Sequence, residues 1–426
     1  MARLFGLADC NNFFVSCEKA FRPDLARRPV VVLSNNDGCV VSRSAEVKAL
    51  GIPMGAPRFQ IEDQIRRHGI AVFSSNFSLY GDMSGRIMRT LRMFAPSVEQ
   101  YSIDEAFFNA WEVPAIRADP VCAGRQIRDY ILKTTGIPVS IGFAPSRTLS
   151  KLANYYVKKH PETGGVMDLS DPDLQHRLLA VCPLEDVWGI GSRLLEKLRL
   201  MGISTPWELA ASDPDAMRRR FGINMQRTIL ELNGVSCFEF EDSPAVRKSV
   251  VHSSTMSEPS DMLRTVSEAV CSHTASAAAI LRQDGLAAGV ITVFIRTGFY
   301  REDQLFHSAS LSARPDPATS DTRVLMHLAL DLLRTMWRQG PQYSKVGVML
   351  TELTGLGGIQ QSLFSTHQDD DGKGKRLMEV MDRINASGGP GVFFLGQGTP
   401  ASTWKSSRKF RSPCYTTCWD DVIRVH

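Results

Sequence analysis

Apolar and polar positions alternate along the chain with two different periods. Residues 83–94 place an apolar side chain at every third or fourth position, which predicts an amphipathic helix. Residues 30–33 form a short β-branched run and residues 290–296 alternate in polarity, and both patterns predict strands. The sequence Asn36-Asp37-Gly38 follows the first run and predicts a hairpin. The interleaving of helical and strand patterns is typical of a protein that contains both helices and sheets.

Shifts in this pattern divide the chain into five segments. Residues 1–165 mix strands and helices, and residues 166–240 are helical and punctuated by glycine. Residues 244–355 show the same strand–helix–strand pattern twice. This repetition predicts the order β-α-β-β-α-β, a split βαβ domain. Residues 356–376 resemble a linker, and residues 377–426 contain one amphipathic helix and then a basic stretch. We therefore expect a multidomain α+β fold.

Composition and charge narrow the class of protein. The chain has 426 residues, 43% of them hydrophobic and 22% charged, which predicts a globular protein of about three domains. Lys and Arg number 49 against 45 Asp and Glu, and the net charge of +4 weakly favours a polyanionic partner. No apolar run approaches the roughly 18–20 residues that span a bilayer, and the first residues do not resemble a signal peptide. We expect a cytoplasmic protein with no membrane partner.

Three carboxylates stand where they could meet. Asp9 ends the first predicted strand, and Asp104 and Glu105 lie at the corner between two later strands. If those strands are neighbours in one sheet, the acids converge and repel one another unless cations neutralise them. Magnesium prefers carboxylate oxygens, and two such ions would support in-line phosphoryl transfer. Surface acids in turns are the alternative, because Asp is common in turns.

Lysines could supply the complementary charge. A helix that Ser146 is expected to cap carries Lys151 and Lys158, seven residues apart. The two lysines therefore share a face, with Asn154 between them, while Lys48 lies in another segment. Ammonium groups aimed at the acids would hold a triphosphate. A solvated helix face is the alternative, because lysine is mostly exposed.

A glycine-rich turn separates two helical stretches. Gly189 and Gly191 lie in the sequence VWGIGS, directly before the second stretch. Such a turn exposes backbone N–H groups at a helix start, where a phosphate can bind. A tight turn between two helices, with no ligand, is the alternative.

Several segments together resemble one enzyme family. Residues 9–18, DCNNFFVSCE, resemble the opening motif of Y-family, translesion DNA polymerases, and residues 101–107, YSIDEAF, resemble their palm motif. Residues 150–154, SKLAN, resemble the helix that faces the triphosphate. The resemblance covers essentially the whole chain. The segments that resemble the UmuC branch, the catalytic subunit of the bacterial SOS mutagenic polymerase, are residues 21–25, 30–39 and 412–417.

The resemblance implies a right-hand polymerase fold with a palm, small fingers, a helical thumb that contains a helix-hairpin-helix, and a little finger of β-α-β-β-α-β order. The implied domains are a palm of 1–15 and 80–165, fingers of 16–79, a thumb of 166–240, a little finger of 244–355, a linker with a clamp-binding peptide at 356–376, and a C-terminal tail region at 377–426. The basic stretch of that tail, residues 405–411, could touch DNA or a partner, or be solvated.

The resemblance also implies roles for single residues. Asp9, Asp104 and Glu105 would be the catalytic acids and, with the backbone carbonyl of Cys10, would hold two Mg²⁺ ions. One ion would activate the primer hydroxyl and the other would hold the triphosphate. The residues implied to contact the nucleotide are Phe13, Phe14, Ser42, Lys48 and Lys158.

Phe14 matches the steric-gate position, where a ring leaves no room for a ribose 2′-hydroxyl. A core aromatic is the alternative. Many relatives carry Tyr at this position and also at the position of Ala45, where the UmuC branch commonly has a small residue. The turn at Gly189 and Gly191 would track duplex phosphates without reading sequence.

The implied function is error-prone, template-directed DNA synthesis past damaged bases in the SOS response, with primer-template DNA and dNTPs as substrates. Gln360, Leu363 and Phe364 resemble the peptide that bacterial polymerases insert into the sliding clamp. A UmuD-type dimer and the RecA filament are the other implied partners, and the active enzyme would be associated with the nucleoid. Two rivals stay open: a non-catalytic DNA-bound scaffold that recruits the clamp and SOS factors, and a nucleotide cyclase.

Overall fold

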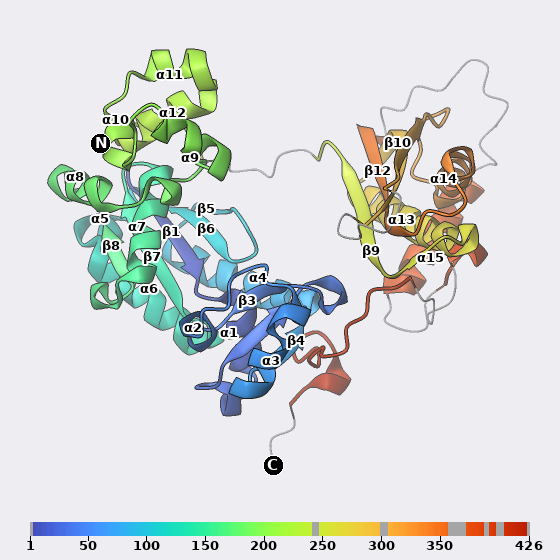
Figure 1. The fold of residues 1–426 in the computed structure, drawn as a ribbon, viewed down its shortest axis with the longest axis horizontal. Helices are drawn as coiled ribbons and strands as arrows, with labels where there is room; N and C mark the ends of the chain where they lie inside the picture. Colours follow the sequence, from blue (N-terminus) through green and yellow to red (C-terminus); the bar gives the residue numbers. More distant parts are fainter. Residues whose placement is uncertain are drawn as a thin grey trace. The chain divides into compact units, whose positions relative to one another are not determined.

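The computed structural model of the protein has two compact units (Figure 1). It describes residues 3–240, 247–298, 306–356, 372–386, 392–397 and 404–423. The first unit comprises Met1–Ser34, Gly38–Pro244 and Phe410–His426, and the second comprises Asn35–Asp37 and Ala245–Lys409. The chain therefore returns to the first unit at its C-terminal end.

A five-stranded sheet forms the centre of the first unit. Its strands are β1 (Phe5–Cys10), β5 (Val98–Gln100), β6 (Glu105–Asn109), β7 (Val139–Ala144) and β8 (Val166–Asp168). Their order is β5-β6-β1-β7-β8, and β1 pairs antiparallel with both β6 and β7. The prediction of two neighbouring strands joined at the Asp104 corner is confirmed, because β5 and β6 form an antiparallel pair.

Helices cover both faces of this sheet. They are α1 (Phe13–Ala20), α4 (Phe77–Phe94), α5 (Pro114–Ala118), α6 (Pro120–Thr135) and α7 (Arg147–Lys159). Gly142 and Phe143 are successive residues of β7 and so point to opposite faces. A side chain at Gly142 would collide with the backbone of α7, whereas Phe143 lies against Gly124 of α6. Helix α7 therefore packs on one face of the sheet and α6 on the other.

Local capping decides where two of these helices begin. Helix α7 begins at Arg147 because the Ser146 hydroxyl accepts a hydrogen bond from the Leu149 N–H, at 3.3 Å. The Asn76 side chain caps α4 in the same way, through the N–H of Leu79. The helices predicted at residues 83–94 and after Ser146 are both confirmed.

A second sheet of three strands lies in the same unit. Its strands are β2 (Val30–Leu33), β3 (Val40–Arg43) and β4 (Ala71–Ser74), and its helices are α2 (Ala45–Ala49) and α3 (Arg58–His68). The order is β3-β2-β4, and β2 pairs antiparallel with β3. The predicted hairpin is confirmed. Its turn takes Asn36 to a φ of 61°, a left-handed conformation that Asn tolerates.

Residues 172–232 fold as a group of short helices with their own apolar core. The helices are α8 (Pro172–Val181), α9 (Ser192–Arg199), α10 (Pro206–Ala210), α11 (Pro214–Phe221) and α12 (Ile223–Leu232). Leu149 and Leu152 of α7 belong to the same core, so this helical group is attached to the central sheet through α7.

The second unit contains one antiparallel sheet and two long helices. Its elements are β9 (Val250–Ser260), α13 (Leu263–Gln283), β10 (Leu286–Thr297), β11 (Ser308–Ala313), α14 (Thr322–Met336), β12 (Tyr343–Gly355) and α15 (Lys373–Ala386). The sheet order is β11-β10-β12-β9. The predicted β-α-β-β-α-β order is confirmed, since α13 and α14 each separate two strands of this sheet.

Three expectations from the sequence concern membrane-spanning helices, the clamp-binding peptide and the basic stretch near the C-terminal end. In the part of the chain that the structure describes, no helix is long and apolar enough to cross a membrane. The expected clamp-binding residues, Gln360, Leu363 and Phe364, lie outside the described residues. Lys405, Arg408, Lys409 and Arg411 of the basic stretch are exposed, while the Phe410 backbone N–H, in the same stretch, donates a hydrogen bond to the Ser74 hydroxyl.

Candidate active site

Two of the expected acids face each other across neighbouring strands. The register of β1 and β6 places Asp9 directly opposite Glu105. The Cys10 N–H donates a hydrogen bond to the carbonyl oxygen of Asp104 at 2.9 Å, so Asp104 lies at the same end of the sheet. The Asp9 and Glu105 side chains are 14% and 17% exposed. The sheet therefore brings both carboxylates into one half-buried place.

Each of these acids is paired with a lysine of α7. The Lys158 ammonium lies 2.5 Å from an oxygen of Asp9, and the Lys151 ammonium lies 3.2 Å from an oxygen of Glu105. Asn154, between the lysines, fixes the helix because its amide donates to the carbonyls of β1 and β7 at 3.2 and 2.7 Å. The lysine face predicted from the sequence therefore points at the acids.

The third acid is held differently. The Ser102 hydroxyl donates a 2.5 Å hydrogen bond to the Asp104 carboxylate. Among the described residues, no three His, Cys, Asp or Glu side chains come close enough together to form a ready-made metal site. The expected convergence is thus met by Asp9 and Glu105, while the Asp104 carboxylate is bound to its own turn.

The chemistry of this group still fits a divalent cation. Carboxylate and carbonyl oxygens are the donors that hard cations prefer. The ammonium groups of Lys151 and Lys158 lie against the two acids and supply positive charge there. Two half-buried carboxylates are stabilised by positive charge beside them, which the lysines supply here and which a bound cation would also supply.

Burial sets the electrostatics of the site. Desolvation raises the pKa of Asp9 to about 7; nearby Lys158 lowers this pKa and nearby Glu105 raises it. Desolvation also lowers the pKa of Lys48 on α2, and the charges of Arg43 and Lys158 lower it further. The charge of Asp9 acts in the opposite direction and raises the pKa of Lys48.

The two adjacent phenylalanines of α1 lie in different places. Phe13 is 3% exposed and belongs to the hydrophobic core. Phe14 is half-buried and stacks on Tyr80 of α4, with ring centroids 4.6 Å apart and planes at 15°. The ring of Phe77 meets the ring of Phe14 edge-on, with centroids 5.9 Å apart. Phe14 is therefore the ring of this pair that can present a face to a ligand.

The Ser42 hydroxyl is engaged with the start of α1. It accepts a hydrogen bond from the Val15 N–H and donates one to the Asn12 carbonyl, each at 3.4 Å. Ser42 is 5% exposed, so it joins β3 to the helix that carries Phe14.

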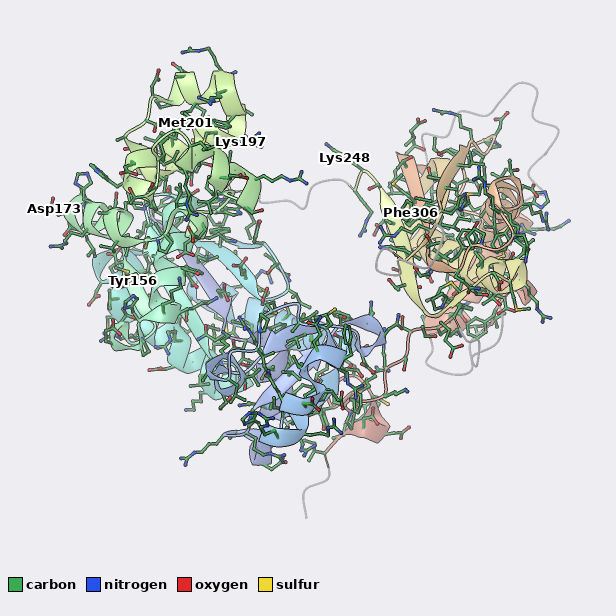
Figure 2. The ribbon with its side chains drawn as sticks, viewed as in Figure 1. Tyr156, Asp173, Lys197, Met201, Lys248 and Phe306 are labelled. Atoms are coloured by element: carbon green, nitrogen blue, oxygen red, sulfur yellow. The ribbon has the colours of Figure 1, made fainter. Side chains whose placement is uncertain are left out.

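The glycine turn is present and lies close to Lys151. Gly189 has a φ of 94°, which favours glycine, and Gly191 precedes the first residue of α9. Trp188 meets Tyr101 edge-on at 5.5 Å, and the Lys151 ammonium lies over both rings, at 5.1 and 4.5 Å. Lys197, further along α9, is labelled in Figure 2. The turn is therefore connected through aromatic contacts to the acidic end of the sheet.

Sequence reasoning missed three side chains that shape the site. Ser102 holds Asp104, and it lies inside a motif that was already recognised. Tyr101 and Tyr80 back Lys151 and Phe14, respectively. The contact of Tyr80 with Phe14 joins residues 66 positions apart in the chain, so no local period reveals it.

Solved structures define the class of fold. A Y-family DNA polymerase chimera matches with a TM-score of 0.65 and 21% identity, over 83% of this chain and 99% of that one. An insertion ternary complex of Dbh DNA polymerase matches with a TM-score of 0.54 and 21% identity, over 82% of this chain and 98% of that one. The fold is that of a Y-family DNA polymerase.

Sequence comparison identifies the family within that class. Residues 8–155 match the impB/mucB/samB family and residues 247–363 match its C-terminal domain, while residues 375–425 match a domain of unknown function. Protein UmuC of Salmonella typhimurium is 42% identical, over 99% of this chain and all of that protein. Protein MucB of Escherichia coli is 38% identical, over 98% of this chain. The chain belongs to the impB/mucB/samB family of UmuC-type Y-family polymerases.

Membership of this family defines the activity. The chain is an error-prone, DNA-directed DNA polymerase of translesion synthesis, and its catalysis depends on a divalent metal. DNA polymerase IV 1 of Bacillus subtilis, at 27% identity over 90% of both chains, extends the similarity to a second group of polymerases.

Proposed function

We propose that this polymerase extends primers past damaged template bases by nucleotidyl transfer at the β1–β6 end of the central sheet. The observation that carries the proposal is the pairing of Asp9 and Glu105 with two lysines of one helix. A non-catalytic scaffold has no need of half-buried, mutually repelling acids, because their burial without cations is unfavourable.

Asp9, Asp104 and Glu105, together with the Cys10 carbonyl, are the residues that would hold two Mg²⁺ ions. When bound, such ions activate the primer hydroxyl and stabilise the charge on the leaving pyrophosphate. Asp104 would be able to join the group if its carboxylate gave up the hydrogen bond from the Ser102 hydroxyl. Lys158 and Lys48 then contact the triphosphate, since each is a flexible point charge.

Phe14 selects the sugar. Its ring is half-buried and backed by Tyr80, so it cannot move away from an incoming ribose. A 2′-hydroxyl would therefore collide with it, whereas a deoxyribose fits. The buried ring of Phe13 and the Ser42 hydroxyl anchor the helix that presents this gate.

We assign the parts of the hand as follows. The palm comprises residues 1–15 and 80–165, the fingers 16–79, the thumb 166–240 and the little finger 244–355. The turn at Gly189 and Gly191 would carry duplex phosphates on its backbone N–H groups, independent of sequence. Small fingers leave the new base pair lightly enclosed, and a site with few contacts loses the shape selection that rejects wrong pairs.

The proposed partners are primer-template DNA, dNTPs, a UmuD-type dimer, the RecA filament and the sliding clamp. The two solved structures described above include a ternary complex, which supports DNA and nucleotide as partners. The clamp would bind Gln360, Leu363 and Phe364, and the enzyme would work at the nucleoid. Clamp affinity of a Leu363→Ala/Phe364→Ala variant tests this peptide, and unchanged affinity would reject it.

The central test is primer extension on undamaged and abasic templates, with Mg²⁺, dNTPs and the accessory proteins. Asp104→Asn should slow extension at least about a hundredfold, because charge stabilisation by metals is worth several kcal/mol. Asp129→Asn, an exposed acid on α6, is the matched control and should keep full activity. Intact primer-template binding without any extension by the unmodified chain would support the scaffold instead. Tight binding to primer-template that weakens steeply with salt would favour either DNA-binding function over the cyclase.

A further inference from the structure

The end of the chain is built into the first unit. The C-terminal strap, residues 410–415, begins where the Phe410 N–H donates to the Ser74 hydroxyl at 2.9 Å and the Ser74 N–H donates back to the Phe410 carbonyl at 3.1 Å. Two residues on, the amide of Asn76 donates to the hydroxyl and to the carbonyl of Ser412, both at 3.1 Å. The strap therefore binds the residues that lead into α4.

The strap also completes the surroundings of a buried carboxylate. Glu18 of α1 is fully buried, and one of its oxygens accepts hydrogen bonds from the Tyr80 hydroxyl at 2.7 Å and from the Ser412 hydroxyl at 3.0 Å. The other oxygen has no hydrogen-bond partner among the described residues. Burial raises the pKa of Glu18, and the two hydroxyls lower it. A buried carboxyl with so few donors depends strongly on each of them.

Tyr80 links this carboxylate to the gate. Its hydroxyl is held by Glu18, while its ring stacks on Phe14 with centroids 4.6 Å apart. Tyr80 is itself fully buried, so its ring has no free space into which it can rotate. The chain of contacts from Ser412 to Glu18, to Tyr80 and to Phe14 is continuous.

We propose that the C-terminal strap is a working part of the nucleotide site: Ser412, acting through Glu18 and Tyr80, positions Phe14 and thereby sets how strongly ribonucleotides are excluded. This assigns a role to the last part of the segment that matches a domain of unknown function. Ser412, Glu18 and Tyr80 are positioning residues, since none of them meets the sugar. The inference rests on the proposed role of Phe14 as the gate.

The test is the ratio of kcat/KM for a dNTP to kcat/KM for the matching rNTP, measured with the full-length chain under conditions that support its primer extension. Ser412→Ala and Tyr80→Phe each remove one hydroxyl from Glu18 while keeping both aromatic rings. Each should lower the ratio by about threefold to tenfold, the size expected when one ordinary hydrogen bond is lost. Ser412→Thr keeps the hydroxyl and should keep the ratio.

Two controls separate positioning from general damage. Thr417→Ala changes an exposed residue just beyond the strap and should leave the ratio unchanged. A merely structural role would lower activity with both nucleotides equally, so the ratio would stay constant while the melting temperature fell. If Ser412→Ala does not fold, Tyr80→Phe decides, because its ring still fills the core.

The outcomes for the inference and for the gate differ. A ratio that is unchanged in Ser412→Ala and Tyr80→Phe, while Phe14→Ala relaxes it, would overturn the role of the strap and leave the gate intact. An unchanged ratio in Phe14→Ala itself would overturn the gate, and the inference with it.

Discussion

Among single residues, charge pairing decides how the groups of the site coexist. Asp9 is half-buried and is partly protonated at pH 7, because desolvation outweighs the effect of Lys158 and raises the pKa of the carboxyl to about 7. The Lys158 ammonium, 2.5 Å away, keeps this pKa lower than burial alone would make it. Lys159 is the next residue on α7, but it pairs with Asp186 at 3.1 Å and does not face the acids.

This difference between neighbouring lysines gives the first prediction. Lys158→Met should lower kcat/KM for dNTPs by about tenfold to a hundredfold, the value of a hydrogen bond to a charged phosphate. Without the ammonium the pKa of Asp9 rises, so the acid limb of the pH–rate profile should move to higher pH. Lys159→Met should change neither quantity. Equal losses in both variants would mean that α7 acts only as a diffuse positive surface.

Among elements, the close approach of α7 to β7 aims both lysines. A side chain at Gly142 would lie 2.4 Å from the Ser150 carbonyl oxygen and 2.7 Å from the Asn154 nitrogen, and both of these atoms are backbone. Neither backbone atom can shift to make room for a side chain at Gly142 unless the whole of α7 moves. The absence of a side chain at this strand position is therefore a condition for the contact of Asn154 with β1 and β7.

Gly142→Ala should therefore destabilise the first unit by about 2 kcal/mol or more, as overpacking of a tight core does. Gly81→Ala is its control: Gly81 lies in α4 with open space around its Cα, and the alanine should be neutral or stabilise the helix by up to about 1 kcal/mol. Urea unfolding of the two variants measures both values. A stable Gly142→Ala variant would show that α7 can shift away from the sheet at little cost.

In the whole molecule, the chain passes from the second unit back to the first between Lys409 and Phe410. Buried polar groups of the first unit, on Ser74, Asn76 and Glu18, find their partners in this last part of the chain. The second unit keeps its own core, which includes Trp404. The stability of the first unit therefore depends on residues 410–426 more than the stability of the second unit does.

A chain that ends at residue 409 should show this inequality. The first unit should lose about 1–3 kcal/mol for each buried polar group left without its partner, whereas the second unit should be unchanged. Hydrogen exchange followed by mass spectrometry reports the two units separately. A chain that ends at residue 417 keeps the strap and is the control. Equal loss of protection in both units would contradict the dependence.

The sequence by itself determined the elements and the reactive residue types. The order β-α-β-β-α-β, the helix capped by Ser146 and the hairpin at Asn36 were all predicted, because period, capping and turn chemistry are local properties. The motifs also placed Asp9 and Glu105 at strand ends that could meet. These features depend on residues that are close together in the sequence, so they can be predicted from the sequence.

Only the tertiary structure decided which groups pair and which are buried. It directed Lys158 to Asp9, turned Asp104 toward Ser102, and joined Ser412 to Glu18 across 394 positions of the chain. Such contacts arise from packing and desolvation, which act between surfaces that folding brings together and leave no period in the sequence. For that reason the sequence showed residues 412–417 only as a segment that resembles the UmuC branch, and the fold shows that Ser412 binds the buried Glu18 carboxylate.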